Sequence, residues 1–385
     1  MPEAVDYRAR ARAMAPLIES RAEAIEEHRE VTPDVNEAIL ESGIPWMLLP
    51  AQFGGGEQGA VELFETVEEL SRADGSTGWH VMANCSAIGA VSAFLPDAGL
   101  ETLFGGEKKS ILAGQLAPMG TGVEVDGGFV ISGRYQFGSG SAYADWMAGG
   151  FVPLDDGKPR TTVDGSLDQR VGVVPKADVV MRGNWDVTGL VGTSSYDYEI
   201  VEQFVPYDLT FERLSTEPAR PQPPFALGVA GLAVGGHTGV ALGLARRALE
   251  ETARLTKGKK RAGYPVPVDQ HPVFLKGFAE HDALYHGARA HLIEVYRDAE
   301  GCVSRGEKLT PVQRARLRQA ATWAHNVATQ VVDFCRLWSG SPAFRNPSVL
   351  GRVIRDIDVA TQHALLDQIT LVDAGTPILE CWREA

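Results

Sequence analysis

The spacing of apolar residues changes twice along the chain, and these changes constrain the fold more than any single motif. Up to about residue 109, apolar residues recur every three or four positions, which is typical of amphipathic helices. From there to 222 the chain has short runs rich in Val, Ile, Phe and Tyr, separated by Gly, Pro and Asp, which is typical of strands. After the proline-rich segment PARPQPPF the helical spacing returns. The sequence therefore predicts three domains: residues 1–109 helical, 110–222 β-rich, and 223–385 a bundle of four antiparallel helices of roughly 20 residues or more.

The first domain is expected to contain four helices. The first spans residues 7–30, and Gly43 closes the second. The third and fourth are expected at about 58–73 and 76–95. Ser76 is a candidate N-cap for the fourth helix, which is apolar on most sides and is therefore expected to be buried.

Composition excludes several classes of function. The chain has 36 Lys and Arg against 50 Asp and Glu, a net charge of −14 that gives no electrostatic reason to bind nucleic acid or an anionic membrane. We find no apolar run of about 18 residues and no signal-peptide-like N-terminus, so neither a membrane span nor secretion is indicated and a cytoplasmic location is predicted. The four cysteines form no CxxC pair and are expected to be reduced and mostly buried; they are Cys85, Cys302, Cys335 and Cys381.

Two motifs resemble known sites but are expected to be structural. The segment FGGGEQG, residues 53–59, fits the pattern G-x-G-x-x-G, but no βαβ unit surrounds it, so a tight loop is predicted instead of a dinucleotide site. His281, His286 and His291 are spaced by five, which rotates each about 140° from the last on a helix. They cannot share one face as metal ligands would, and surface or packing roles are expected. No HExxH, P-loop or GxSxG motif is present.

The segment GRYQFGSGSAYADW, residues 133–146, combines features of a ligand-binding strand. It contains an aromatic residue, Phe137, and a hydroxyl, Ser139, flanked by Gly138 and Gly140. The glycines allow another group to approach the backbone closely, and a serine can hydrogen-bond a ring nitrogen. On this pattern alone, a sheet edge with a bulge remains the alternative.

This segment resembles the flavin-contacting strand of the acyl-CoA dehydrogenase superfamily, in which a hydroxyl residue seven positions before a Trp donates to flavin N5. Ser139 and Trp146 keep that interval. The preceding AGQLAPMGTGVEVDGGFVISGRY resembles the superfamily's flavin-edge loop and hairpin. The resemblance implies that the backbone near Gln115 and Leu116 meets the pyrimidine end of the isoalloxazine. The form GGFVISGRYQFGSG is similar to the branch of two-component flavin monooxygenases, which implies that Phe137 and Gly140 also belong to the flavin site.

The C-terminal part departs from the dehydrogenases of this superfamily. Arg355 and Asp356 match their RD pair, and the catalytic Glu of many members lies eight residues beyond the Asp, which here is Ala364. Alanine cannot abstract a proton, and residues 232–243, where other members carry the Glu, contain no carboxylate. His363, one place before the alanine, resembles a histidine of the monooxygenases. An imidazole with a near-neutral pKa can hydrogen-bond oxygen activated on a flavin or take a proton from a phenol or amine, although a lone helical histidine is by itself more often a packing residue.

Other expected site residues rest on the resemblance too. His80, Trp79 and Asn84 lie on the predicted buried helix, which in the monooxygenases lines the cavity over the flavin; packing is the alternative for His80. Arg261 and Gln270 resemble an Arg and a Gln that reach the flavin phosphates, often from a neighbouring subunit, and the guanidinium fork suits phosphate oxygens.

The resemblance implies an α+β, mostly α fold with an N-terminal helical domain, a middle β-barrel and a C-terminal four-helix bundle, usually assembled as a homotetramer through the bundles. It implies an oxygenase component that takes reduced FMN or FAD from a separate flavin reductase by diffusion and uses O2 to hydroxylate a small molecule. Ser139 would hold the flavin, His363 would act as acid or base, and the cavity near His80 would exclude water. The alternatives are an acyl-CoA dehydrogenase-like enzyme with a displaced base and a flavin-free scaffold or binding protein.

Overall fold

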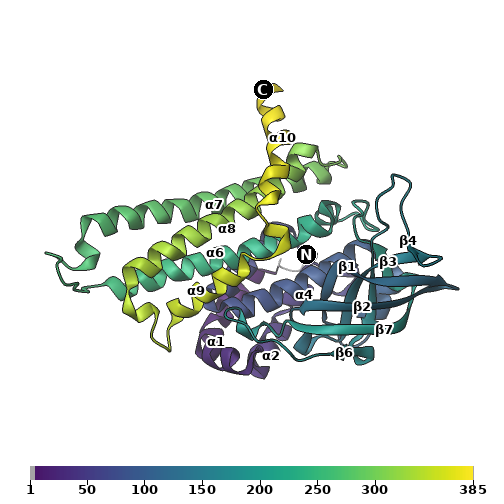
Figure 1. Cartoon of the computed structure of the whole chain (residues 1–385), viewed down its shortest axis with the longest axis horizontal. Helices are drawn as coiled ribbons and strands as arrows, with labels where there is room; N and C mark the ends of the chain where they lie inside the picture. The colour runs from purple at the N-terminus through teal and green to yellow at the C-terminus, as the bar shows by residue number, and fades with distance from the viewer. Residues whose placement is uncertain (1–4, 385) are drawn as a thin grey trace.

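The structure is a computed structural model that describes residues 5–384. A helical bundle and a β-sheet lie at opposite ends of an elongated molecule, with the N-terminal helices packed against both (Figure 1). The N-terminal helices are α1 (Tyr7–His28), α2 (Pro33–Ser42), α3 (Ala60–Ala73), α4 (Gly75–Phe94) and α5 (Asp97–Phe104). Four of these helices confirm the predicted ones, and Gly43 closes α2 in the left-handed conformation with φ 72°.

The predicted cap of the fourth helix is wrong. Asp74 is the N-cap of α4, and its carboxylate accepts from the backbone N–H and the hydroxyl of Thr77 at 2.8 and 2.9 Å. A carboxylate is as good an N-cap as a serine hydroxyl, and it lies earlier in the chain. Ser76 therefore lies inside the helix, where its Oγ accepts from the backbone N–H of Gly192 at 3.0 Å.

The glycine-rich segment 53–59 is a tight loop, as predicted. A Cβ added to Gly55 would lie 2.0 Å from the carbonyl oxygen of Leu49, so a side chain does not fit there. The segment ends at Gly59, the N-cap of α3. Its neighbours along the chain are a short 3₁₀ turn and a helix, which is not the setting of a dinucleotide-binding loop.

The middle part of the chain forms one mixed sheet. Its strands are β1 (Leu112–Val125), β2 (Gly128–Gly138), β3 (Trp146–Asp155), β4 (Lys158–Pro159), β5 (Arg170–Pro175), β6 (Val179–Met181), β7 (Tyr196–Pro206) and β8 (Thr210–Glu212). They are ordered β6-β7-β2-β1-β3-β5-β8, with β4 beside β3, and only β1 and β3 run parallel. Within residues 5–384 no pairing joins β6 to β8, so the sheet is open and the predicted barrel is not confirmed.

The C-terminal bundle consists of α6 (Gly228–Thr256), α7 (Pro272–Ser304), α8 (Pro311–Ser339) and α9 (Val349–Ala360), followed by α10 (Ile369–Glu384). The predicted length of about 20 residues is wrong for the fourth helix, because α9 has 12 residues. His363 follows it in the connection, where its Nδ1 accepts from the backbone N–H of Leu365 and caps a 3₁₀ turn. The histidine therefore begins a new turn and does not continue α9.

The apolar character of α6 is explained by its place in the core. By length and composition, Pro223–Thr256 passes a test for a membrane-spanning helix, but 83% of its most apolar window is buried inside the fold. No span was expected from the sequence, and the burial identifies this segment as a core helix of the bundle.

Helix α4 joins two apolar cores. Its first half, including Trp79 and Met82, packs into the core shared with the bundle, and its second half, including Ile88 and Val91, packs into the core under the sheet. All its residues except Ala83 and Ser86 are buried, as predicted for a helix that is apolar on most sides. Residues on α4 are therefore held between the sheet and the bundle.

Buried ion pairs fix the N-terminal helices to the bundle. Glu68 and Glu69 of α3 are buried, and they meet Arg289 of α7 at 2.9 Å and Arg246 of α6 at 3.2 Å respectively. Burial opposes the charge on Glu69, but Arg12 and Arg246 outweigh it and lower the pKa of Glu69 to about 2. Removing one partner would leave a buried charge, which is a large destabilisation. All four cysteines are free thiols; three are buried, as predicted, and Cys381 is half-exposed.

Candidate active site

The turn after β2 requires the residues that stand there. Gly140 has φ 75°, and a Cβ there would lie 2.6 Å from the side-chain nitrogen of Asn84 on α4. Phe137 also has positive φ, 62°, which is costly for a side chain of this size. Its ring is 58% exposed and lies edge-on to Trp185 at 6.2 Å. Strain of this kind is frequent at binding sites, so this turn is a candidate functional position.

Ser139 is the first member of a chain of buried hydroxyl groups. Trp79 Nε1 donates to Ser139 Oγ at 3.0 Å, and Ser139 Oγ lies 2.7 Å from Ser195 Oγ. Ser195 Oγ lies 2.7 Å from Thr193 Oγ1, which donates to the carbonyl oxygen of Leu190 at 2.8 Å. The serine between the glycines is therefore held by α4 on one side and by the loop before β7 on the other.

Trp79 connects Ser139 to a pair of histidines. The centre of its ring lies 5.0 Å from that of His237 on α6 and 6.0 Å from that of His363, both edge-on. The two imidazole rings lie 4.1 Å apart with their planes 35° from parallel. Four segments far apart in sequence thus bring Ser139, Trp79, His237 and His363 together, where the bundle meets the sheet domain.

The site histidines are neutral at pH 7. Burial lowers the pKa of His363 to about 4, and burial together with the nearby His363 and His325 lowers that of His237 well below its usual value. The near-neutral pKa expected for His363 is therefore wrong, because the imidazole is withdrawn from water among other rings. Since Nδ1 of His363 accepts from Leu365, we infer that its proton is on Nε2. The His363 imidazole thus has one N–H donor, on Nε2, and does not carry a second proton at pH 7.

His80 and Asn84 lie one helical turn apart on α4, close to Trp79 in the sequence. His80 is 2% exposed, its ring lies 6.1 Å from that of Tyr143, and burial lowers its pKa to about 4. In residues 5–384 its Nδ1 has no hydrogen-bond partner. Asn84 donates to the carbonyl oxygen of Leu112 at 2.8 Å and supports the Gly140 turn. Asn84 therefore supports the turn after β2 from the α4 side.

Asp356 of the RD pair anchors the loop that carries the hydroxyl chain. Its Oδ1 accepts from the backbone N–H of Leu190 at 2.6 Å. Ser76 Oγ accepts from Gly192 N–H in the same loop, and the carbonyl oxygen of Thr193 accepts from Gly140 N–H at 2.9 Å. The loop has strained positions at Leu190 and at Ser194, with φ 51° and 45°. Strain of this kind persists only where the surroundings fix it.

A second carboxyl group lies beside Asp356. Burial and the neighbouring Asp74 raise the pKa of Asp356 to about 7, and burial raises that of Asp74. Asp74 accepts two hydrogen bonds from Thr77, which favour its charged form. Asp74 Oδ1 and Asp356 Oδ2 are both buried, and neither has another partner within residues 5–384. We infer that Asp356 holds the proton of this pair near neutral pH.

Comparison with known proteins decides the family. Residues 2–97 match the family model "Acyl-CoA dehydrogenase, N-terminal domain" and residues 236–368 match "Acyl-CoA dehydrogenase, C-terminal domain". The chain is 30% identical to the indole-3-acetate monooxygenase of Pseudomonas putida over 358 residues, which is 92% of this chain and 89% of that protein. It belongs to the flavin-dependent monooxygenase branch of the acyl-CoA dehydrogenase superfamily.

Two further proteins are similar to this monooxygenase. The flavin-dependent monooxygenase oxygenase subunit HsaA of Rhodococcus jostii is 27% identical over 366 residues, 92% of this chain and 93% of that one. XiaF from a Streptomyces species, solved with FADH2 and glycerol, has the same fold, with a TM-score of 0.89 over 97% of this chain and 95% of that one at 22% identity. The monooxygenase is thus a flavin-dependent oxidoreductase.

The residues around Ser139 fit a flavin ring. In β1 the pairing with β3 is interrupted between Gln115 and Gly120, so the backbone from Leu116 to Met119 leaves the ladder beside this site. Gln115 N–H donates to the Tyr198 hydroxyl at 2.7 Å. Trp146 pairs with Leu112, whose carbonyl oxygen Asn84 holds. A flat ring with polar edges suits an exposed aromatic, a buried hydroxyl and backbone groups outside the strand ladder.

Arg261 and Gln270 lie far from Ser139 in the same chain. Both are in the loop between α6 and α7, at the end of the bundle opposite the sheet (Figure 1). From His237 to Thr256 at the end of α6, the helix rises roughly 28 Å. Arg261 donates to the carbonyl oxygens of Leu337 and Trp338 at 2.9 and 2.6 Å, and Gln270 is exposed. Within one chain, Arg261 and Gln270 are therefore too far from Ser139 to share a site with it.

Sequence reasoning missed His237 and the loop Leu190–Ser195. The segment 232–243 was searched for a carboxylate, and its histidine was the signal that it carries a different titratable group. Nothing in the stretch LVGTSS indicates a hydroxyl chain, because its partner Ser139 is 56 positions away. His325, buried on α8, lowers the pKa of His237 and belongs to the same cluster.

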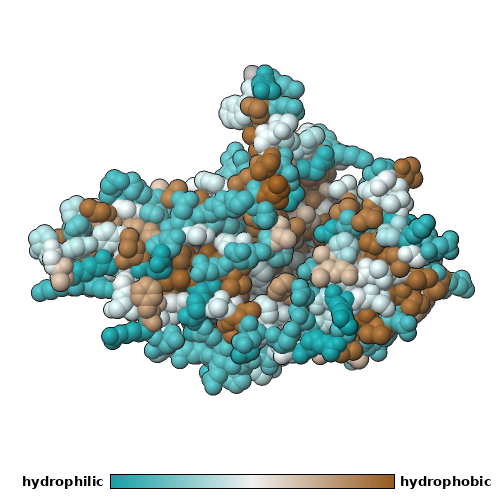
Figure 2. All heavy atoms as spheres, in the orientation of Figure 1, coloured by the Kyte–Doolittle hydropathy of each residue, from teal (hydrophilic) through white to brown (hydrophobic). Residues whose placement is uncertain are grey.

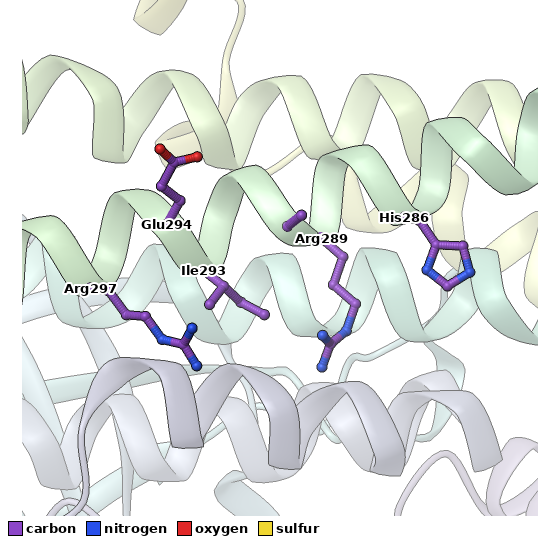
Figure 3. A pocket seen from close by; sticks show the side chains of 6 residues that line it. His286, Arg289, Ile293, Glu294 and Arg297 are labelled. Atoms are coloured by element: carbon purple, nitrogen blue, oxygen red, sulfur yellow. The ribbon is translucent and has the colours of Figure 1, made fainter.

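A separate groove of about 560 Å³ lies on α7, lined by His286, Arg289, Ala290, Ile293, Glu294 and Arg297. Figure 3 shows Arg289 and Arg297 pointing to the same side of α7, and Arg289 reaches Glu65 and Glu68 of α3. None of its lining residues belongs to the site around Ser139. His281, His286 and His291 each have a different neighbour: Phe334, Asp282 and Trp323.

Proposed function

We propose that this monooxygenase hydroxylates a small aromatic molecule, using O2 and reduced flavin delivered by a separate reductase. The observation that carries the proposal is the meeting of the Ser139 turn with the neutral His237–His363 pair at one indole ring. The names of its relatives, which include an indole-3-acetate monooxygenase and an oxygenase subunit, support the substrate class and the separate reductase.

The residues have distinct proposed roles in this site. Bound reduced flavin would supply the electrons that activate oxygen. His363 would donate its Nε2 proton in a hydrogen bond. Its one lone pair, on Nδ1, accepts from Leu365 N–H, so His363 would receive a substrate proton only transiently and only after that contact is broken. Trp79, buried between Ser139 and the histidines, would exclude water. His80, neutral and without a partner for Nδ1, would contact substrate or flavin.

Dehydrogenation of an acyl thioester is less well supported. Ala364 stands where the superfamily's dehydrogenases carry a carboxylate, and residues 232–243 offer His237 instead. Proton abstraction next to a thioester needs a base held against the substrate, and an imidazole with a strongly lowered pKa is a weak one.

We further propose that the flavin site is shared between subunits of a homotetramer. Arg261 and Gln270 would reach the flavin phosphates of a neighbouring chain, because their own Ser139 is at the other end of the bundle. Helix α10 supports an assembly. It leaves the body of the molecule and carries exposed apolar side chains, and Figure 2 displays them above a recess between the bundle and the sheet; they are Ile369, Val372, Leu379 and Trp382.

A complementation experiment tests the shared site. Arg261→Ala should weaken flavin binding by roughly 10- to 100-fold, because a charge-assisted hydrogen bond to phosphate is lost. At a flavin concentration too low to load the Arg261→Ala variant, Arg261→Ala and His363→Ala chains should each be nearly inactive alone. When co-expressed they should regain up to about one quarter of wild-type activity, since random mixing creates sites with both residues intact. If each chain uses its own Arg261, the mixture stays inactive.

Hydroxylation itself is tested with a flavin reductase and NADH. We expect oxygen to be incorporated into one member of a panel of phenols, indoles and aryl acetates, measured by mass spectrometry with labelled O2. Reduction of bound oxidised flavin by an acyl-CoA, with no incorporation of label, would contradict the proposal.

A further inference from the structure

The hydroxyl chain behind Ser139 has one proton arrangement that satisfies every contact. Thr193 Oγ1 donates to the Leu190 carbonyl oxygen at 2.8 Å, and a hydroxyl has one proton to give. The 2.7 Å contact between Thr193 and Ser195 therefore requires Ser195 to donate. With its proton committed, Ser195 can only accept from Ser139, which donates across 2.7 Å.

This arrangement leaves Ser139 as an acceptor toward any ligand. Its proton goes to Ser195, and the indole N–H of Trp79, which can only donate, occupies one of its two lone pairs. The remaining lone pair is what Ser139 Oγ can present. Ser139, Ser195 and Thr193 are 9%, 2% and 0% exposed, so water does not compete within the chain.

We propose that Ser195 and Thr193 hold Ser139 as an acceptor for the N5–H of reduced flavin, and that they thereby set the preference for reduced over oxidised flavin. The proposal rests on the proposed function, in which Ser139 faces flavin N5. Reduced flavin carries a proton on N5 and can donate it, whereas N5 of oxidised flavin has only a lone pair. The family resemblance implied that the Ser139 hydroxyl donates to flavin N5. The hydroxyl groups of Ser195 and Thr193 reverse that direction, because they take the proton of Ser139.

The backbone keeps the chain in place. Thr193 and Ser195 lie in a loop whose strained residues Leu190 and Ser194 are fixed by Asp356 and by the Gly140 turn. The carbonyl oxygen that ends the chain belongs to Leu190, the residue whose N–H binds Asp356. The carbonyl oxygen at the end of the hydroxyl chain is therefore held in place by the bond from Leu190 N–H to the buried Asp356. Ser195 and Thr193 act as positioning residues.

Ser195→Ala tests the proposal through binding and not through turnover. Without Ser195 the proton of Ser139 is free to turn toward N5, so oxidised flavin should bind more tightly and reduced flavin less tightly. We expect the ratio of the Kd for oxidised FMN to the Kd for reduced FMN to fall by roughly three- to tenfold, the effect of one neutral hydrogen bond. Thr193→Val should move the ratio in the same direction, and Thr193→Ser should restore it.

Ser141→Ala is the matched control. Ser141 is buried and donates to the Ser194 carbonyl oxygen of the same loop at 2.9 Å, but it is outside the chain. In Ser141→Ala the ratio of the Kd for oxidised FMN to the Kd for reduced FMN should equal that of the wild type, although the loop loses one hydrogen bond. An unchanged ratio in Ser195→Ala, or an equal fall in Ser141→Ala, would overturn the inference while leaving the proposed function intact. Failure of the wild-type protein to bind either form of FMN or FAD would overturn both.

Discussion

Replacing His363 with Ala is expected to lower product formation at least about 100-fold, the usual scale for loss of a positioned acid or base. Flavin oxidation should continue at a similar rate, because O2 reacts with reduced flavin without the imidazole. Oxygen should then leave as hydrogen peroxide, so the coupling of flavin oxidation to product should collapse. The measurement is the ratio of product to NADH consumed in the reductase-coupled assay. The physical reason is the position of His363, next to His237 and Trp79 at the Ser139 turn.

His363→Asn and His286→Asn complete this test. Asparagine can donate a hydrogen bond but does not accept a proton at neutral pH, so His363→Asn separates the two proposed roles. His286 has a side chain 66% exposed on α7, and its replacement should leave coupling unchanged. Unchanged coupling in both His363 variants would remove His363 from the chemistry.

Asp356→Ala is expected to destabilise the protein and to weaken flavin binding, while Asp356→Asn is tolerated. Alanine leaves the buried N–H of Leu190 without an acceptor, which costs about 1–3 kcal/mol, and it releases the loop that holds Ser195. Asparagine keeps the acceptor oxygen, and its amide can donate to Asp74. The measurements are the free energy of unfolding and the Kd for reduced flavin, and equal stability of the Ala and Asn variants would contradict the anchoring role.

The stability of Asp356→Asn relative to the wild type is expected to depend on pH. The folded pKa of about 7 lies above the ordinary value, so the folded protein holds this proton and the contribution of Asp356 is lost as pH rises toward and through 7. Above that pH the wild type carries a buried charge that costs up to about 4 kcal/mol, which asparagine avoids. The Tm of Asp356→Asn should exceed that of wild type at pH 8.5 and converge with it near pH 4. Asp373→Asn, an exposed carboxylate on α10, should show no such trend.

The sequence predicts well where the pattern of apolar residues decides the type and burial of an element. α3 and α4 follow from apolar spacing, and the segment 53–59 was assigned to a loop because helices flank it. Ser139 was found because a hydroxyl between two glycines is a local signal for a close approach, and the family resemblance then added Trp146 by its interval from Ser139. The closed barrel came from resemblance, and in the structure β6 and β8 remain unpaired edges.

Long-range features could not be predicted in the same way. The stretch from Asp356 to His363 has helical spacing, but in the structure α9 ends at Ala360 and His363 caps a separate 3₁₀ turn. His237 and His363 are 126 positions apart, and no periodicity connects them. Their lowered pKa values result from burial between α6, α8 and α4, which depends on packing and not on the neighbouring residues in the sequence.

The most direct test is rapid mixing of the protein, loaded anaerobically with reduced FMN or FAD, with oxygenated buffer while absorbance is followed. The account predicts a transient whose spectrum differs from both reduced and oxidised flavin, lasting much longer than oxidation of free flavin, and decaying with product when substrate is present. Oxidation in one step at the rate of free flavin, with tight retention of oxidised FAD that an acyl-CoA can reduce, would contradict it.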